Sequence, residues 1–258
     1  MNSSHYLRNI GTLSLCLLLA IAGFGAFHGK TSPVSVQIAD KKLPIYCVQT
    51  DSPKVAISFD AAWGNEDTAQ LLSILEEQGV KTTFFMTGGW VESYPEDVKA
   101  IAAAGHDLGN HSENHKQMSQ ISATECKEEI QKVHDKVKEL TGQDMTLFRP
   151  PYGDYNDTLV ESANGLGYHV IQWDVDSLDW KDYGVDAIVS KVLEHPHLGN
   201  GSIILMHNGA KYTKDALEQV ITGLQAKGFE IVPVSQLIYT ENYEMDHEGR
   251  QFIKGSGQ

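Results

Sequence analysis

Short apolar runs alternate with amphipathic segments along most of this chain, and the alternation predicts strands joined by helices. The apolar runs are bounded by turn signals, as buried strands are. They cover residues 55–59, 81–86, 106–109, 145–148, 168–173, 202–206 and 229–234. Apolar residues at helical spacing between these runs predict helices over residues 68–78, 96–104, 122–140, 157–164, 186–194 and 214–226.

This succession of strand–helix units defines the expected fold class. Strands that alternate with helices pair in parallel, because each helix carries the chain back along the sheet. We therefore expect an α/β fold, namely a distorted (β/α) barrel of about seven parallel strands with outer helices. An open doubly wound sheet is the alternative, since a regular barrel of this kind has eight strands.

The N-terminal segment has the composition of a membrane-spanning or exported sequence. Residues 10–27 form an uncharged, mostly apolar stretch of 18 residues, with Arg8 before it and Lys30 after it. This length is at the lower edge for a transmembrane helix, and a cleaved signal peptide is the alternative. We favour a retained anchor within residues 1–30. Either interpretation places the rest of the chain outside the cytoplasm, anchored to the cell membrane or secreted.

The remaining chain divides by composition into three parts. Residues 31–52 contain two prolines and predict a linker, with a short strand over residues 45–48. Residues 53–240 carry the strand and helix pattern and predict the folded domain. Residues 241–258 are polar and predict a loose tail.

The charge of the chain narrows its possible partners. The formal net charge is −14 at pH 7, and all 34 acidic residues lie at or after Asp40. Binding to nucleic acid requires clustered Lys and Arg to neutralise phosphates, so this acidic body argues against a nucleic-acid partner. A neutral sugar polymer is compatible with it.

The cysteines add little chemistry. Cys47 and Cys126 are the two cysteines outside the apolar N-terminal run, and the sequence has no Cys-x-x-Cys pattern. A thiolate metal site is therefore not expected. Outside the cell these two residues could form a disulfide, but their spacing in sequence does not place them within bonding distance.

Polar signatures follow five of the apolar runs. They are Ser58-Phe59-Asp60, His111-Ser112-Glu113-Asn114-His115, Arg149-Pro150-Pro151-Tyr152-Gly153, Asp176-Ser177-Leu178-Asp179-Trp180 and Leu205-Met206-His207. The active site of an α/β barrel is built at the carboxyl ends of its strands. We therefore expect these side chains to meet in one active site, whose composition suits metal-assisted hydrolysis.

The first candidate residues are a histidine pair and a carboxylate. His111 and His115 are four residues apart and can bind a divalent metal ion through imidazole nitrogen. Asp60 ends the first predicted strand and could activate water as a general base. Arg149, stiffened by the two prolines after it, could pair with a carboxylate and fix its orientation.

The remaining candidates follow the last polar signatures. His207 ends an apolar strand and is a candidate general acid, because the unperturbed pKa of histidine lies near neutrality. A carboxylate beside it would raise that pKa, and Asp176 or Asp179 could serve. Trp180 offers a flat apolar face on which a sugar ring could stack.

These signatures, in this order, resemble the polysaccharide deacetylases of the NodB homology type, which form carbohydrate esterase family 4. The resemblance covers about residues 54–238, and the most specific elements are Asn-His-Ser-x-x-His, Arg-Pro-Pro-Tyr-Gly, Asp-x-x-Asp-Trp and Leu-x-His. The Phe-Asp-Ala-Ala-Trp-Gly start and the N-terminal anchor further resemble the sporulation-associated, PdaB-like branch of this family.

The resemblance implies a divalent metal, usually zinc, and removal of acetyl groups from N-acetylated amino sugars of peptidoglycan or a chitin-like polymer. It also assigns a role to each candidate. His111 and His115 would be metal ligands, Asp60 the base, Arg149 its orienting partner, Asp176 the residue that tunes His207, and His207 the acid. The backbone N–H of Tyr152 would help to hold the oxyanion, and Trp180 and Leu205 would line the pocket for the acetyl methyl group.

One departure from the family pattern concerns the metal. Members of the family usually carry a second Asp after the first, as the third metal ligand, and this chain has Ala61 there. A methyl group cannot coordinate a metal ion, so two histidines alone predict weaker binding. A metal-dependent N-deacetylase is the first hypothesis. A glycan-binding homologue that has lost turnover is the second, and a rearranged site in which Asp60 or another carboxylate becomes a ligand is the third.

Overall fold

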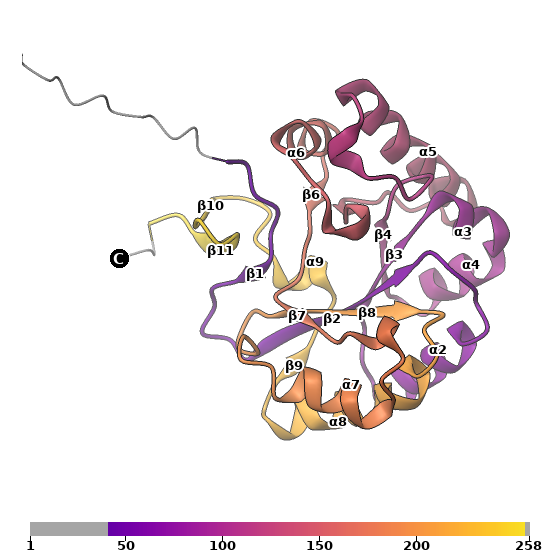
Figure 1. Ribbon diagram of the computed structural model, residues 1–258, viewed down its shortest axis with the longest axis vertical. Coiled ribbons are helices and arrows are strands. Elements are labelled where there is room, and N and C mark those ends of the chain that lie inside the picture. Colours follow the sequence, from indigo (N-terminus) through magenta and orange to yellow (C-terminus); the bar gives the residue numbers. More distant parts are fainter. Residues whose placement is uncertain (1–40, 256–258) are drawn as a thin grey trace, which may run out of the picture. The chain divides into compact units, whose positions relative to one another are not determined.

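Parallel strands form the main sheet of the computed structural model, which describes residues 41–255 (Figure 1). Seven strands are joined side by side, and β9 (Glu230–Ile231) pairs with the start of β2. In sheet order the seven are β6 (His169–Val170), β5 (Leu147–Phe148), β4 (Asp107–Asn110), β3 (Thr83–Met86), β2 (Lys54–Ala61), β8 (Ile203–Asn208) and β7 (Val175–Asp176). The sheet curls into a distorted, incompletely closed (β/α) barrel, so the expected fold class is confirmed.

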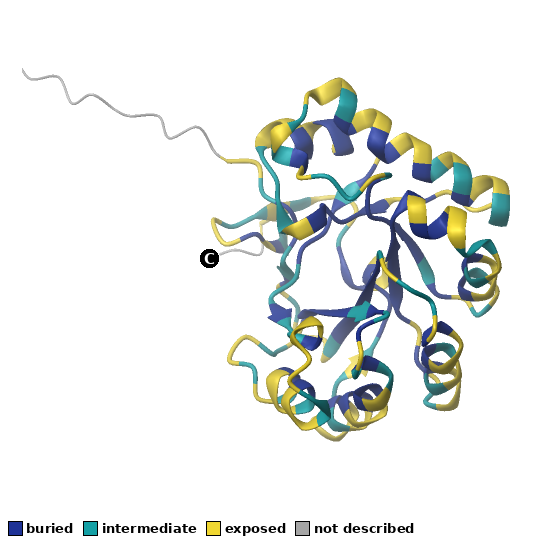
Figure 2. Ribbon diagram, turned by 45° about the vertical axis from the view of Figure 1, so that its right-hand side comes forward, coloured by how far each residue is buried: buried dark blue, intermediate teal, exposed yellow. Residues whose placement is uncertain are grey.

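Helices surround the curled sheet and cover its outer face (Figure 1). The larger ones are α2 (Thr68–Glu77), α4 (Pro95–Ala103), α5 (Ala123–Thr141), α6 (Asp157–Asn164), α7 (Val185–Leu193) and α8 (Thr213–Ala226). Two short ones are α3 (Gly88–Ser93) and α9 (Val234–Leu237). In Figure 2 each larger helix shows a buried face toward the strands and an exposed face toward solvent, which is the pattern that predicted them from sequence.

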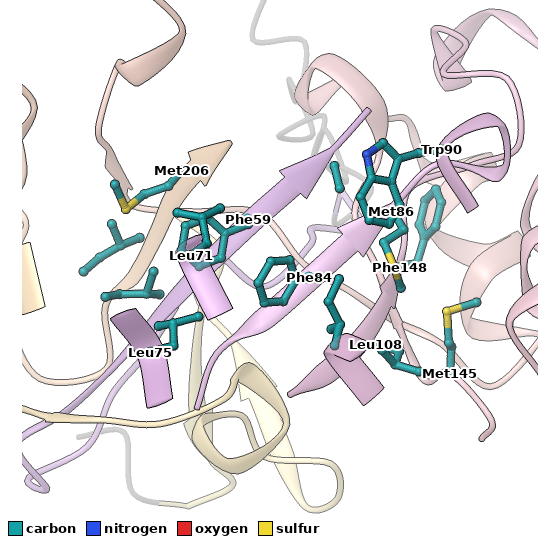
Figure 3. Close-up of a cluster of buried hydrophobic side chains, with 14 of the residues drawn as sticks. Phe59, Leu71, Leu75, Phe84, Met86, Trp90, Leu108, Met145, Phe148 and Met206 are labelled. Atoms are coloured by element: carbon teal, nitrogen blue, oxygen red, sulfur yellow. The ribbon is translucent and has the colours of Figure 1, made fainter. Parts of the chain in front are cut away.

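The core lies between the outer face of the sheet and these helices. Phe59 of β2 stacks on Phe84 of β3 with ring centroids 4.9 Å apart, and both are fully buried (Figure 3). Leu71 and Leu75 of α2 pack into the same cluster, as their spacing of four on one helical face predicts. Burial of this apolar surface holds the strands in a fixed register, and the register sets the positions of the polar residues at their ends.

The central strands bring the first and last polar signatures together. Asp60 of β2 lies directly beside His207 of β8 in the ladder, and Phe85 of β3 lies on its other side. On the next strand, β4 ends at Asn110, one residue before the histidine pair begins. The carboxyl ends of β2, β4 and β8 therefore point their following residues to the same end of the barrel, as predicted.

The structure contains the short strand predicted over residues 45–48 and shows that the predicted tail is not loose. The strand β1 (Cys47–Val48) pairs in parallel with β11 (Arg250–Ile253), which pairs antiparallel with β10 (Tyr243–Met245). Residues 41–52 and 241–255 thus belong to the folded part of the chain. The fully buried side chain of Gln251 ties β11 to the chain before the hairpin, because it accepts a hydrogen bond from the backbone N–H of Tyr239 and donates one to the carbonyl of the same residue. A polar residue that is buried and satisfied in this way leaves no apolar signal in the sequence.

The predicted N-terminal anchor over residues 10–27 lies outside the described residues. Within residues 41–255, none of the helices is both long and apolar enough to cross a membrane. Cys47 and Cys126 are both free thiols rather than partners in a disulfide.

Candidate active site

A cavity of about 490 Å³ opens at the carboxyl ends of the strands. It brings together eight of the nine residues predicted for the site, namely Asp60, His111, His115, Tyr152, Asp176, Trp180, Leu205 and His207. The ninth, Arg149, is fully buried and bonds to Asp60 from behind the cavity. Residues that are far apart in sequence therefore converge on one pocket.

Asp60 is a buried carboxylate. Its Oδ1 accepts a hydrogen bond from Nη1 of Arg149 at 2.8 Å, and only 5% of the residue is exposed. Burial acts to raise the pKa of Asp60, but the charge of Arg149, with that of His207, outweighs it and holds the pKa below the usual range. Asp60 is therefore ionised at neutral pH, as a general base must be.

His111 presents a free ring nitrogen to the cavity. Its Nδ1 lies 2.7 Å from the carbonyl oxygen of Arg149, to which it donates, so Nε2 keeps its lone pair. Burial lowers the pKa of His111 to about 4, and the ring is neutral near pH 7. Its Nε2 lies 3.6 Å from Oδ2 of Asp60, and because the imidazole is neutral this contact is not an ion pair.

The chain between the two histidines is anchored by a residue that the sequence analysis did not identify. Glu129, buried on α5, accepts hydrogen bonds from the backbone N–H and the side-chain amide of Asn114, at 2.8 and 2.7 Å. Lys116 lies 3.2 Å from the same carboxylate. These contacts lower the pKa of Glu129 despite its burial, and they fix the backbone that carries His115.

Three residues around the cavity adopt the left-handed backbone region that favours glycine. Ser112 has φ +64°, His115 has φ +52° and Tyr152 has φ +61°. Such conformations cost free energy and persist where the surrounding structure requires them, which is common at functional sites. The ring centroid of His115 lies 5.0 Å from that of His111 and 4.5 Å from that of Tyr152. Burial lowers the pKa of His115 as well.

Of the two carboxylates that the sequence offers as partners of His207, Asp179 is the one that bonds to it directly. Asp179, which is fully buried, accepts from Nδ1 of His207 at 2.7 Å and from its backbone N–H at 2.7 Å. Asp179 also accepts from Oγ1 of Thr213 at 2.6 Å. Asp176 lies on the cavity wall instead, where its Oδ1 caps the backbone N–H of Leu178. Asp176 acts on His207 only through its charge.

The surroundings of His207 raise its pKa. Burial acts to lower its pKa, but the hydrogen bond and charge of Asp179, with the charges of Asp60 and Asp176, outweigh burial and raise the pKa above its usual value. The imidazolium form therefore persists to higher pH than in an unperturbed histidine, which suits a general acid. Burial raises the pKa of Asp176.

Aromatic side chains form the walls of the cavity. Tyr152 and Trp180 are 67% and 48% exposed, so their rings are available to a ligand, whereas Leu205 is buried at the base. Trp63 and Trp173 also line the cavity, and the sequence analysis did not identify either. Exposed aromatic faces beside polar groups are suited to stacking against sugar rings.

The donor set fits a divalent metal ion only in part. His111 and His115 supply two neutral imidazoles, which suit zinc among other ions. A catalytic zinc site normally has three protein ligands, and Ala61 offers no donor atom. In the described part of the chain no group of three or more His, Cys, Asp and Glu side chains is arranged to hold a metal ion.

A parallel (β/α) barrel with the carboxylate of Asp60, the pair His111 and His115, and His207 at its mouth is typical of a hydrolytic site. Comparison with known proteins identifies the family to which the chain belongs. The sequence profile of the family described as polysaccharide deacetylase matches residues 48–171, and the chain belongs to this family, carbohydrate esterase family 4. The deacetylases of this family depend on a divalent metal.

Individual relatives cover the barrel to different extents. The chain is 33% identical over 194 residues to the peptidoglycan-N-acetylglucosamine deacetylase of Bacillus cereus, with 72% of this chain and 69% of that protein covered. It is 34% identical over 195 residues to the uncharacterised protein YlxY of Bacillus subtilis, with 76% of this chain and 60% of that protein covered. The chain therefore spans less than two thirds of the length of YlxY.

A third similarity is to a solved structure. The structure is that of a pseudoenzyme of carbohydrate esterase family 4 from Bacillus anthracis, with a TM-score of 0.73 and 33% identity over 76% of this chain and 68% of that one. A mutant of that pseudoenzyme is described as having restored enzymatic activity, and it also has a TM-score of 0.73. This chain is thus similar both to a deacetylase and to a family member that lacks activity.

Proposed function

We propose that this protein removes N-acetyl groups from amino sugars of a cell-wall polysaccharide, with peptidoglycan as the first candidate and a chitin-like polymer as the second. The observation that carries the proposal is that a carboxylate and a histidine with complementary partners lie side by side in one cavity. Arg149 keeps Asp60 ionised, and Asp179 favours the protonated form of His207. A base and an acid held in these states are what amide hydrolysis requires.

The reaction follows from these states. Asp60 accepts a proton from a water molecule as the water oxygen adds to the acetyl carbonyl carbon. His207 then gives a proton to the amine nitrogen as the carbon–nitrogen bond breaks, so the products are acetate and the free amino sugar. The left-handed turn at Tyr152 places its backbone beside the cavity, where its N–H is proposed to hold the developing oxyanion. Trp180 and Leu205 are proposed to enclose the methyl group.

Zinc is the ion that we propose for His111 and His115, because neutral imidazole nitrogen is a preferred zinc ligand. A bound zinc ion would polarise the acetyl carbonyl and favour attack by water. With Ala61 in place of a third ligand, the affinity is expected to be lower than in a three-ligand site. Metal content of the purified protein, before and after dialysis against a chelator, measures this directly.

Acetate release tests the activity. The protein is incubated with N-acetylglucosamine oligomers and with peptidoglycan, with and without added zinc. We expect release that falls about a hundredfold or more in Asp60→Asn and in His207→Ala, because general acid–base groups contribute factors of roughly 10² to 10⁴. Asp51→Asn and His247→Ala are the matched controls, since both residues are exposed and outside the cavity. Release that is equal in all five proteins would reject the assigned roles.

A second candidate is a glycan-binding protein without turnover. Ala61 favours it, as does the similarity to the Bacillus anthracis pseudoenzyme. This alternative predicts saturable binding of peptidoglycan fragments, no acetate release with any divalent metal, and little loss of binding in Asp60→Asn. Acetate release that depends on Asp60 would exclude it.

The apolar N-terminal segment supports a location outside the cytoplasm, which is where a cell-wall polymer is found. We further propose that residues 10–27 anchor the protein to the cell membrane, and that the protein acts on the cell wall during spore formation. Fractionation of cells with an antibody to the folded domain separates membrane-bound from released protein. Recovery of the protein only in the soluble cytoplasmic fraction would contradict this location.

A further inference from the structure

Trp63 lies against the proposed acid at the mouth of the cavity. Its indole stacks on the imidazole of His207, with ring centroids 5.1 Å apart and planes inclined by 28°. Both rings line the same cavity, and Trp63 is 49% exposed. One flat face of the proposed acid is therefore covered by an aromatic ring.

The loop that carries Trp63 is bonded to the segment that follows His207. The carbonyl of Gly64 accepts hydrogen bonds from Nδ2 of Asn208 at 3.1 Å and from Nε1 of Trp90 at 3.2 Å. The backbone N–H of Gly209 donates to both carboxylate oxygens of Asp67, at 2.9 and 3.0 Å. The segments that follow Trp63 and His207 are thus tied together, which restricts how far the indole can move from the imidazole.

Close approach of the two loops depends on Gly209. Its φ is +88°, and a Cβ atom there would lie 3.1 Å from the carbonyl oxygen of Gly64 and 3.5 Å from Cβ of Trp63. A larger residue would have to push the loop of Trp63 away from the end of β8. The absence of a side chain at Gly209 therefore lets the loop of Trp63 lie close to the end of β8.

Four other residues bond to His207 or act on it through their charge. Asp179 of the 3₁₀ helix η3 (Asp179–Lys181) holds the Nδ1 edge of the ring, and the carboxylates of Asp60 on β2 and Asp176 on β7 act on it through their charge. His115, in the loop after β4, also interacts electrostatically with the ring. Asp179 fixes one edge but leaves rotation and tilt of the ring plane to be set by whatever packs on its faces, and Trp63 is the stacked partner there.

We propose that Trp63 is a positioning residue for His207, whose indole face holds the imidazolium ring in the orientation that directs Nε2 into the cavity. The proposal rests on the assignment of His207 as proton donor in the proposed function. Stacking also has an electrostatic consequence, because the face of an indole ring attracts a cation. Loss of the ring therefore changes how readily His207 is protonated as well as how it is oriented.

The first test is an NMR titration of the metal-free protein, with His207 identified by the loss of its signals in His207→Gln. We expect Trp63→Leu to lower the pKa of His207 by roughly half a unit to one unit, and Trp63→Phe to lower it by less. Leucine keeps much of the shielding from water without an aromatic face, so the comparison isolates the ring. Tyr183→Leu, which removes an exposed aromatic ring outside the cavity, is the matched control.

This titration does not depend on turnover, so it stands even if the protein releases no acetate. A His207 pKa that is unchanged or raised in Trp63→Leu would overturn the proposal, because it would assign Trp63 only to shielding. Where acetate release is measurable, Trp63→Leu is expected to lower kcat about tenfold with little change in KM. A rise in KM at unchanged kcat would also overturn it, since Trp63 would then bind sugar directly.

Discussion

Arg149 and Asp60 form an ion pair that is closed off from solvent, with 2.8 Å between Nη1 and Oδ1. The second guanidinium nitrogen, Nη2, donates to Oγ of Ser58 at 2.8 Å and to the carbonyl of Gln172 at 3.2 Å. The guanidinium carbon also lies 4.1 Å from the centre of the Phe85 ring. The direction of the proposed base is therefore set by a buried cation that bonds both to β2 and to the segment after β6.

Removal of this cation is expected to destabilise the fold. Arg149→Met leaves the carboxylate of Asp60 buried without its partner, and breaking a buried pair in this way costs about 3–5 kcal/mol of unfolding free energy. Urea unfolding measures the loss. Arg250→Met is the control, because its ion pair with Asp246 spans 4.0 Å at the surface and is worth about 1 kcal/mol or less. Equal losses in the two variants would contradict the role of Arg149.

Asp179 and Asp176 provide a matched pair for testing His207. Asp179→Asn removes the charge that directly holds the imidazole, so the pKa of His207 is expected to fall toward or below its usual value. Asp176→Asn is expected to lower it less, because Asp176 acts only through space. Because its pKa is raised on folding, His207 contributes to the stability of the folded protein below its unfolded pKa. This contribution is lost as the pH rises through the folded pKa. The alkaline limb of acetate release should accordingly move to lower pH more in Asp179→Asn, and the reverse order would contradict the assignment.

His106 predicts an acid-sensitive contribution to stability that is independent of catalysis. Its Nδ1 accepts from the backbone N–H of Thr82 at 3.1 Å, and burial lowers its pKa to about 4. The unfolded chain therefore binds a proton more readily, so stability is present above pH 6.5 and is lost as the pH falls toward 4. His106→Asn keeps an acceptor for Thr82 but has no group that titrates in this range. When the pH is lowered from 7 to 5, we expect the unfolding free energy of the wild type to fall by about 2 kcal/mol more than that of the variant. Urea unfolding at the two pH values measures the difference, and parallel losses would contradict it.

The anchoring of the histidine pair is tested at Glu129. Glu129→Leu removes the acceptor for Asn114 and leaves its backbone N–H without a partner, so the loop that carries His115 should lose its fixed geometry. We expect a roughly tenfold or greater loss of zinc affinity, comparable to loss of other groups that orient metal ligands. Calorimetric titration of zinc measures it. Glu125→Gln is the control, since Glu125 contacts Lys116 at the surface and not the loop backbone, and an equal loss there would contradict the role of Glu129.

The elements that the sequence predicted well are those with repeated apolar spacing. The strand around Phe59 and the helix around Leu71 and Leu75 were predicted because each buries one continuous face. The hairpin around Gln251 was predicted as a tail, because its pairing depends on a buried amide and on contact with β1, neither of which produces an apolar period. The strand β7, which is two residues long, was missed for the same reason.

The sequence predicted which residues form the site better than it predicted which of them bond to each other. Strand ends gave Asp60 and His207, since chemistry at the carboxyl end of a barrel is a property of the fold. The choice between Asp176 and Asp179 depended on which of two nearby carboxylates reaches the ring, and only the structure shows that this is Asp179. Trp63 belongs to the Phe-Asp-Ala-Ala-Trp-Gly start, but nothing in the sequence indicates a contact with His207, because that contact depends on stacking across two loops.

Ala61 offers the sharpest test of the metal site. It is fully buried at the end of β2, next to Asp60. Ala61→Asp introduces a carboxylate that is costly to bury alone, so the metal-free variant should be less stable than the wild type. A zinc ion shared with His111 and His115 would relieve that cost, because the carboxylate would complete a three-ligand set. We therefore expect the unfolding midpoint of this variant to rise with zinc, by an amount equivalent to about 2.7 kcal/mol at a hundred times the dissociation constant.

The control for this change is Ala61→Asn, which has nearly the same volume but no anionic ligand. Its unfolding midpoint should respond to zinc no more than that of the wild type. Acetate release measured on the same three proteins then separates the two candidate functions. If Ala61→Asp gains zinc affinity and activity together, the wild-type site is limited by its missing ligand. If it gains zinc affinity while acetate release stays absent, the catalytic roles of Asp60 and His207 are contradicted and the glycan-binding function is favoured.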